Sequence, residues 1–97
     1  IRSIDKRIPL DDLAIELKMN FEDFLTEIET IVYSGTKLNI DYFIEEILDE
    51  ENIEDIYDYF MHSDTDNIDA AVKEFDGEFS DEEIRLVRIK FISEMAN

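Results

Sequence analysis

The chain has no cysteine and only two glycines, one proline and one histidine among its 97 residues. Without cysteine there is no disulfide, no thiolate metal site and no cysteine nucleophile. The single histidine, His62, excludes a metal site built from several histidines. So few helix breakers, together with abundant Glu, Leu, Ile and Lys, predict an almost entirely helical fold.

Basic residues are also few, and they are unevenly placed. The chain has 9 Lys and Arg against 27 Asp and Glu, a formal net charge of -18, and no Lys or Arg between Leu38 and Val72. Neutralising phosphates requires Lys and Arg, so this composition excludes nucleic-acid binding by overall charge. A role on nucleic acid would depend on a small local patch or on a partner domain.

Long apolar runs and a signal peptide are absent, so we expect no membrane partner. Hydrophobic residues nevertheless make up 44% of the chain, which is enough for a core and argues against disorder. The chain begins at Ile1 rather than Met, and we expect it to be a fragment of a longer protein. The length suits one domain or two tightly joined halves.

Helical periodicity organises the chain into an all-α fold of about six helices. We expect these helices over residues 10–18, 21–34, 41–48, 53–62, 67–75 and 81–95. Residues 1–9 are comparatively basic and are expected to be a linker from an upstream domain. Residues 10–97 are then expected to be a single helical domain, with a helix-turn-helix at 10–48 and a helical half at 49–97.

Two local signals support these boundaries. Gly35 follows the second helix, where a left-handed C-terminal cap is expected. Ser80 and Glu83 have the spacing of a capping box at the start of the last helix. That helix is apolar around much of its circumference, which predicts a central position in the core.

Residues 10–35 have the pattern of a helix-turn-helix, with Met19 and Asn20 at the turn. Residues 36–40 are the best strand candidate and would form a minimal wing, giving a winged-helix-like first half. In DNA-binding versions the second helix offers Arg, Lys, Asn or Gln to the major groove. Its expected outward residues here carry no positive charge, which favours a structural or protein-binding use. They are Glu22, Asp23, Thr26, Glu27, Glu29 and Thr30.

Four residues are candidates for contact with nucleic acid: Lys37, Tyr42, Arg85 and Arg88. Lys37 and Tyr42 are the basic and aromatic residues nearest the predicted wing. Arg85 and Arg88 are three apart on the last helix, face the same side and suit a phosphate or an acidic partner. The alternative is a solvated Lys37, with both arginines paired to the acidic middle helices.

Six carboxylates of the middle helices are the candidate partner-binding face: Glu45, Glu46, Asp49, Glu54, Asp55 and Asp58. They do not follow the spacing of a calcium-binding EF-hand loop. They form either a solvated face or a surface that docks a basic protein or keeps DNA away. No residue pattern indicates a catalytic, cofactor-binding or metal site, so the chain by itself is not expected to be an enzyme.

Residues 10–17 (LDDLAIEL) and 24–42 (FLTEIETIVYSGTKLNIDY) are similar to the C-terminal helix-turn-helix region of bacterial RecQ-family DNA helicases, and residues 82–95 extend the similarity. The resemblance implies a non-catalytic accessory domain of an ATP-dependent 3′-to-5′ DNA helicase of DNA repair and recombination. Such a domain would modulate the choice of DNA substrate or recruit partners.

The same resemblance implies where the chemistry of the parent helicase would lie. ATP and Mg²⁺ would bind upstream, with the helicase motifs and the zinc-binding cysteines, and no cofactor would bind these residues. The implied partners are the helicase core of the same chain, DNA and a basic protein, in the bacterial cytoplasm at the nucleoid. Family accessory domains often bind DNA through basic surfaces, and the acidity of this chain departs from that pattern. The alternative is an acidic interaction adaptor that mimics or screens DNA.

Overall fold

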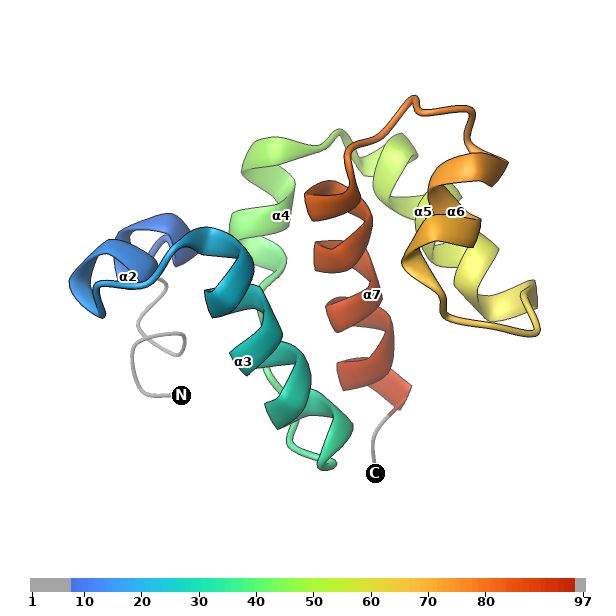
Figure 1. Cartoon of the computed structure of the whole chain (residues 1–97). Coiled ribbons are helices and arrows are strands. Elements are labelled where there is room, and N and C mark those ends of the chain that lie inside the picture. The colour runs from blue at the N-terminus through green and yellow to red at the C-terminus, as the bar shows by residue number, and fades with distance from the viewer. Residues whose placement is uncertain (1–7, 96–97) are drawn as a thin grey trace.

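The computed structural model describes residues 8–95, which contain six helices and no strand (Figure 1). The helices are α2 (Leu10–Glu16), α3 (Phe21–Tyr33), α4 (Asp41–Ile47), α5 (Glu50–His62), α6 (Ile68–Glu74) and α7 (Asp81–Met95). The predicted all-α fold and the predicted number of helices are confirmed.

Helix α7 lies at the centre, with α3 and α4 on one side and α5 and α6 on the other (Figure 1). Its residues Ile84, Leu86, Val87 and Ile89 are at most 1% exposed. A helix that is apolar in several directions can be stable in water only when neighbours cover it on several sides. Helix α2 packs on α3, away from this centre. One hydrophobic core therefore joins residues from the first and the second half of the chain.

Both predicted helix-boundary signals are confirmed. The Ser80 amide donates to Glu83 Oε1 at 2.8 Å, and the Glu83 amide donates to Ser80 Oγ at 3.2 Å. This reciprocal pair satisfies two amides that have no partner inside α7. Gly35 has a φ of 100° just after α3, a conformation that costs glycine little because it has no Cβ.

The predicted strand at residues 36–40 does not form, so the predicted wing is wrong for the described residues. Leu38 and Ile40 are buried, as their alternation indicates. However, no described segment pairs with them as a second strand. A side chain of α7 supplies the hydrogen bonds of the Leu38 backbone instead. Ser93 Oγ accepts from the Leu38 amide at 2.7 Å and donates to the Leu38 carbonyl at 2.8 Å.

Two helix boundaries differ from the prediction by more than one residue. Helix α2 ends at Glu16, two residues earlier than predicted, because Lys18 has a left-handed φ of 58°, and Leu17 is 60% exposed. Helix α5 begins at Glu50, three residues earlier than predicted, after extended backbone at Leu48 and Asp49. The early start places acidic residues in the first turn of α5, where the helix dipole favours them.

Candidate binding surfaces

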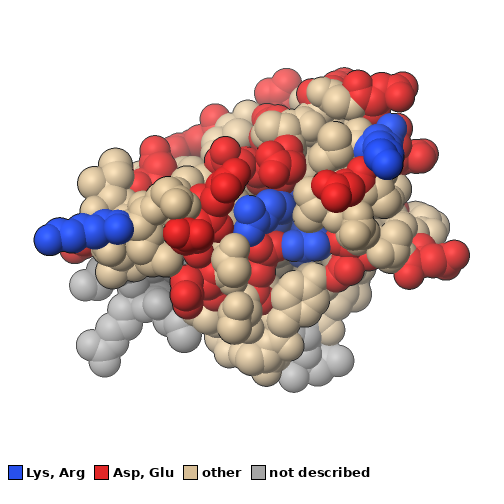
Figure 2. Space-filling view, viewed as in Figure 1, with Lys and Arg blue, Asp and Glu red and all other residues tan. Residues whose placement is uncertain are grey.

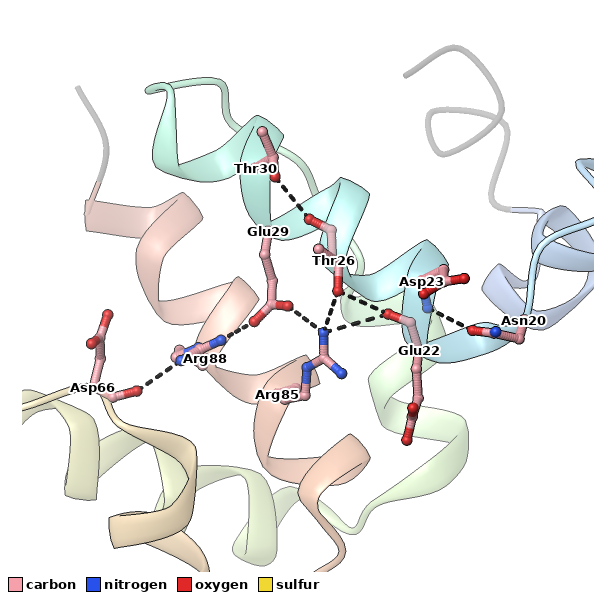
Figure 3. A network of polar contacts seen from close by, with 9 residues as sticks. All are labelled: Asn20, Glu22, Asp23, Thr26, Glu29, Thr30, Asp66, Arg85 and Arg88. Atoms are coloured by element: carbon pink, nitrogen blue, oxygen red, sulfur yellow. Dashed lines mark hydrogen bonds and ion pairs between the residues drawn. The ribbon is translucent and has the colours of Figure 1, made fainter.

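A buried charge network joins α3 to α7 (Figure 3). Glu29 of α3 pairs through Oε1 with the guanidinium of Arg85 and through Oε2 with that of Arg88. The Glu29 side chain is 11% exposed and each arginine side chain 14%. Each carboxylate oxygen thus has its own cation, which offsets the cost of removing the carboxylate from water. We call these three residues the charge triad.

On the Arg85 side, the triad reaches along α3. The Arg85 Nη2 atom donates to Thr26 Oγ1 at 3.1 Å and lies 3.5 Å from the Glu22 carbonyl (Figure 3). The polar side of α3 that faces α7 is therefore occupied within the protein.

On the Arg88 side, the triad reaches the loop between α5 and α6. Arg88 Nη1 donates to the Asp66 carbonyl at 2.8 Å, and the Arg88 guanidinium lies 6.0 Å from the centre of the Tyr33 ring. The Tyr33 hydroxyl donates to the Asp66 carboxylate. Burial, and then the hydrogen bond to Asp66, raise the pKa of Tyr33, so the hydroxyl keeps its donor proton. The network thus connects three separate elements.

The triad corrects two expectations from the sequence. Glu29 was expected on the outer face of its helix, and it is 8% exposed. Arg85 and Arg88 were expected to pair with the acidic middle helices, and they pair with Glu29 of α3 instead. The sequence contained a signal for the burial of Glu29, because this residue follows Leu25 by four positions and so shares the apolar side of α3.

The other two nucleic-acid candidates lie apart from the triad. The Tyr42 hydroxyl donates to the Ile8 carbonyl at 2.6 Å, and burial raises the pKa of this half-buried tyrosine. Lys37 is exposed and lines a cavity with Asp41 and Glu94. The structure therefore brings only Arg85 and Arg88 together, and it brings them onto a carboxylate.

A groove runs where α4, α5 and α7 meet. Three cavities of about 580, 420 and 230 Å³ share Lys90 among their lining residues. The largest has Ile44, Leu48 and Ile53 among its apolar lining. We call this region the acidic groove, because seven carboxylates line it. They are Asp41, Glu45, Asp49, Glu50, Glu54, Asp58 and Glu94.

Lys90 occupies the point that the three cavities share. Its Nζ lies 2.9 Å from Asp41 Oδ1, 2.6 Å from Glu94 Oε2 and 5.8 Å from the centre of the Tyr57 ring. The Tyr57 hydroxyl donates to the other oxygen of Glu94 at 2.9 Å. An edge contact between Tyr57 and Phe91, with ring centres 5.5 Å apart, supports the tyrosine ring.

These contacts shift the titration of both charged partners. Burial acts to lower the pKa of Lys90, but its hydrogen bonds to Glu94 and Asp41 outweigh burial and raise the pKa. Burial acts to raise the pKa of Glu94, but the hydrogen bonds from Lys90 and Tyr57 outweigh it and lower the pKa. The ion pair therefore holds both groups in their charged forms.

The structure brings together most of the acidic face predicted from the sequence. Four of its six residues line the acidic groove, whereas Glu46 and Asp55 are exposed outside it. The six-residue face predicted from the sequence left out Asp41, Glu50 and Glu94, which also line the groove. The spacing contained a signal, because Glu50, Glu54 and Asp58 recur every four residues and so share one face of α5.

The described residues contain no group of three or more histidine or carboxylate side chains placed to hold a metal ion. None of the helices in residues 8–95 is both long enough and apolar enough to cross a membrane.

These features define a small all-helical protein with a helix-turn-helix, a buried charge triad and an acidic groove. Residues 1–44 match the family model of the RecQ-1-like helix-turn-helix domain. The match covers α2, α3 and the first turn of α4, and it confirms the resemblance to the C-terminal helix-turn-helix region of RecQ-family proteins. Comparison with curated proteins gave no match.

Proposed function

We propose that this chain is a non-catalytic accessory domain at the C-terminal side of a RecQ-like, ATP-dependent 3′-to-5′ DNA helicase of DNA repair and recombination. The family match over residues 1–44 supports this proposal. ATP and Mg²⁺ would bind the helicase core of the parent protein, in the bacterial cytoplasm, and that core is the first expected partner. No residue of this chain is assigned to either cofactor.

Of the two roles such a domain can have, we propose recruitment of partners rather than direct reading of DNA. The observation that carries this choice is that Glu29 already engages both arginines that were candidates for phosphate contact. Helix α3 itself contains no Lys or Arg, so its exposed carboxylates would repel phosphates.

The accessory role is tested in the parent protein by deleting residues 10–97. We expect the truncated parent to retain ATP hydrolysis stimulated by single-stranded DNA, because a non-catalytic domain supplies no group to that reaction. We expect it to lose a partner, or to change its preference among forked and duplex substrates. A parent without helicase motifs, or a truncation that abolishes ATP hydrolysis, would contradict the proposal.

Fluorescence anisotropy tests whether the 97-residue chain binds DNA directly, with labelled single-stranded, duplex and forked DNA across a salt series. We expect no saturable binding even at low salt, where attraction to phosphates is strongest. Saturable binding that weakens with salt would favour the substrate-choice role instead. Lys37→Gln would then be the first variant, with Lys73→Gln, an exposed lysine on α6, as its matched control.

The second candidate function is an acidic adaptor that mimics or screens DNA. Figure 2 supports it, because Asp and Glu side chains are spread over much of the face shown and flank the Lys and Arg atoms at its centre. A competition experiment separates the two functions. Duplex DNA that displaces the chain from a basic DNA-binding protein would support mimicry, whereas binding to the helicase core alone would support the accessory role.

A further inference from the structure

We propose that the acidic groove binds an extended lysine- or arginine-rich segment of a partner protein. The proposal deepens the recruiting role, on which it rests, by assigning that role a site and the partner a chemistry.

The acidic groove has an excess of unpaired negative charge. Among the residues that the structure describes, only Asp41 and Glu94 of the seven groove carboxylates form an ion pair, and both pair with Lys90. The other five line the same cavities as Lys90 and form no ion pair with a described residue. A chain of positive charges fits such a surface, because each side chain meets a carboxylate of opposite sign.

Lys90 already shows how the groove holds a cation. Its ammonium sits between two carboxylates and near the face of an aromatic ring. Tyr57 also lines the smallest cavity, together with Glu54 and Asp58. A lysine or arginine from outside would find the same combination of carboxylates and ring there.

The shape and the charge of the groove favour a peptide over nucleic acid as its occupant. The largest cavity, about 580 Å³, has room for side chains, and its apolar lining of Ile44, Leu48 and Ile53 suits their aliphatic stems. A phosphate that approached Lys37 would meet Asp41 and Glu94 in the same cavity. The sequence-based nucleic-acid candidate Lys37 therefore lies at the edge of a surface that repels phosphate.

The test is fluorescence anisotropy with a labelled peptide of alternating lysine and alanine, at fixed ionic strength. The groove variant is E45Q/E50Q/E54Q. The control variant, E16Q/E27Q/E74Q, removes the same number of charges from exposed positions on α2, α3 and α6. We expect saturable binding that weakens about tenfold in the groove variant and less than about twofold in the control, because each exposed charge contact contributes a factor of about two. Circular dichroism verifies that both variants keep the helical fold.

Three results would overturn the proposal. Equal weakening in both variants would show a general attraction to net charge. Displacement of the peptide by single-stranded DNA would assign the groove to nucleic acid. Tighter binding by an R2Q/K6Q/R7Q variant would make the basic start of this same chain the occupant. The assay contains no helicase, so its failure leaves the accessory role standing, and failure of the deletion experiment leaves this result standing.

Discussion

The two sides of α7 treat charge in opposite ways. On the side facing α3, two arginines enclose one glutamate, and all three side chains are at least 86% removed from water. Where α7 meets α4 and α5, Lys90 lies among seven carboxylates that line an open groove, and Lys37 is the other lysine of its lining. The first side has an excess of positive charge and the second a large excess of negative charge.

The difference follows from the cost of burying charge. A charge taken out of water destabilises the fold unless a partner and hydrogen bonds compensate it, whereas water solvates an exposed carboxylate at little cost. Both arginines among the described residues lie beside Glu29, where they compensate the charge of this largely buried carboxylate. As a consequence, these two arginine side chains are largely withdrawn from water, whereas Asp and Glu side chains are spread over the face shown in Figure 2.

The largest predicted effect is a loss of stability when the buried charge triad is disrupted. Glu29→Ala leaves two guanidinium groups without their carboxylate, and we expect a loss of about 3 kcal/mol in the free energy of unfolding, because removing one partner of a buried pair leaves uncompensated charge. Urea unfolding measures it. Glu27→Ala, an exposed position on the same helix, is the control and is expected to change stability by no more than about 0.5 kcal/mol. A loss below about 1 kcal/mol for Glu29→Ala would mean that water compensates the arginines.

The next effect concerns Ser93, on the α7 surface that carries residues 36–40. Ser93→Ala removes the partner of both the amide and the carbonyl of Leu38 at a buried position. We expect a loss of about 1–3 kcal/mol, because unsatisfied buried polar groups keep their full desolvation penalty. Ser34→Ala, which removes an exposed hydroxyl, serves as the control. Equal losses in the two variants would show that residues 36–40 do not depend on α7.

Sequence patterns predicted the helices of this fold well, because local chemistry determines them. The periodicity of α3, the glycine after it and the Ser80–Glu83 box all act over a few residues. The wing prediction was wrong for a long-range reason. Alternation at Leu38 and Ile40 correctly indicated burial, but it does not reveal whether a second strand or a helix covers the segment.

The candidate surfaces were harder to predict, because they depend on which helices meet. Arg85 and Arg88 were recognised as a pair on one side of their helix, yet their partner lies 56 and 59 residues away in the chain. The acidic face was partly recognised, because the spacing within α4 and α5 is local. The contributions of Lys90 and Glu94 follow only from the packing of α7 between those helices.

A smaller effect separates the paired from the unpaired carboxylates of the groove. Because the folded pKa of Glu94 is lowered, its contribution to stability is present above the ordinary pKa and is lost as pH falls through the lowered value. Glu94→Gln should therefore lower the free energy of unfolding by up to about 1 kcal/mol at neutral pH and should not change it in strong acid. The expected loss is small because the Glu94 side chain is 47% exposed and water screens the ion pair.

Urea unfolding of both proteins across the acid range measures this difference. Lys90→Met is the companion variant, since the raised pKa of Lys90 makes its contribution present below the ordinary value and lost as pH rises through the raised one. A Glu94→Gln difference that is constant with pH would mean that hydrogen-bond geometry, and not charge, accounts for the interaction.

The smallest effect has the opposite sign. Neutralising unpaired groove carboxylates in E45Q/E50Q/E54Q should stabilise the chain by a few tenths of a kcal/mol at low salt, because like charges on a crowded surface repel one another. Sodium chloride at about 1 M should remove the gain, since screening then acts within about 3 Å. Urea unfolding at two salt concentrations measures it, with E16Q/E27Q/E74Q as the equal-charge control. A larger gain in the groove variant than in the control would show that the groove is held more acidic than stability alone favours, as a surface kept for binding cations would be. Equal gains would attribute the repulsion to net charge, and the contrast between the two sides of α7 would then reflect burial alone.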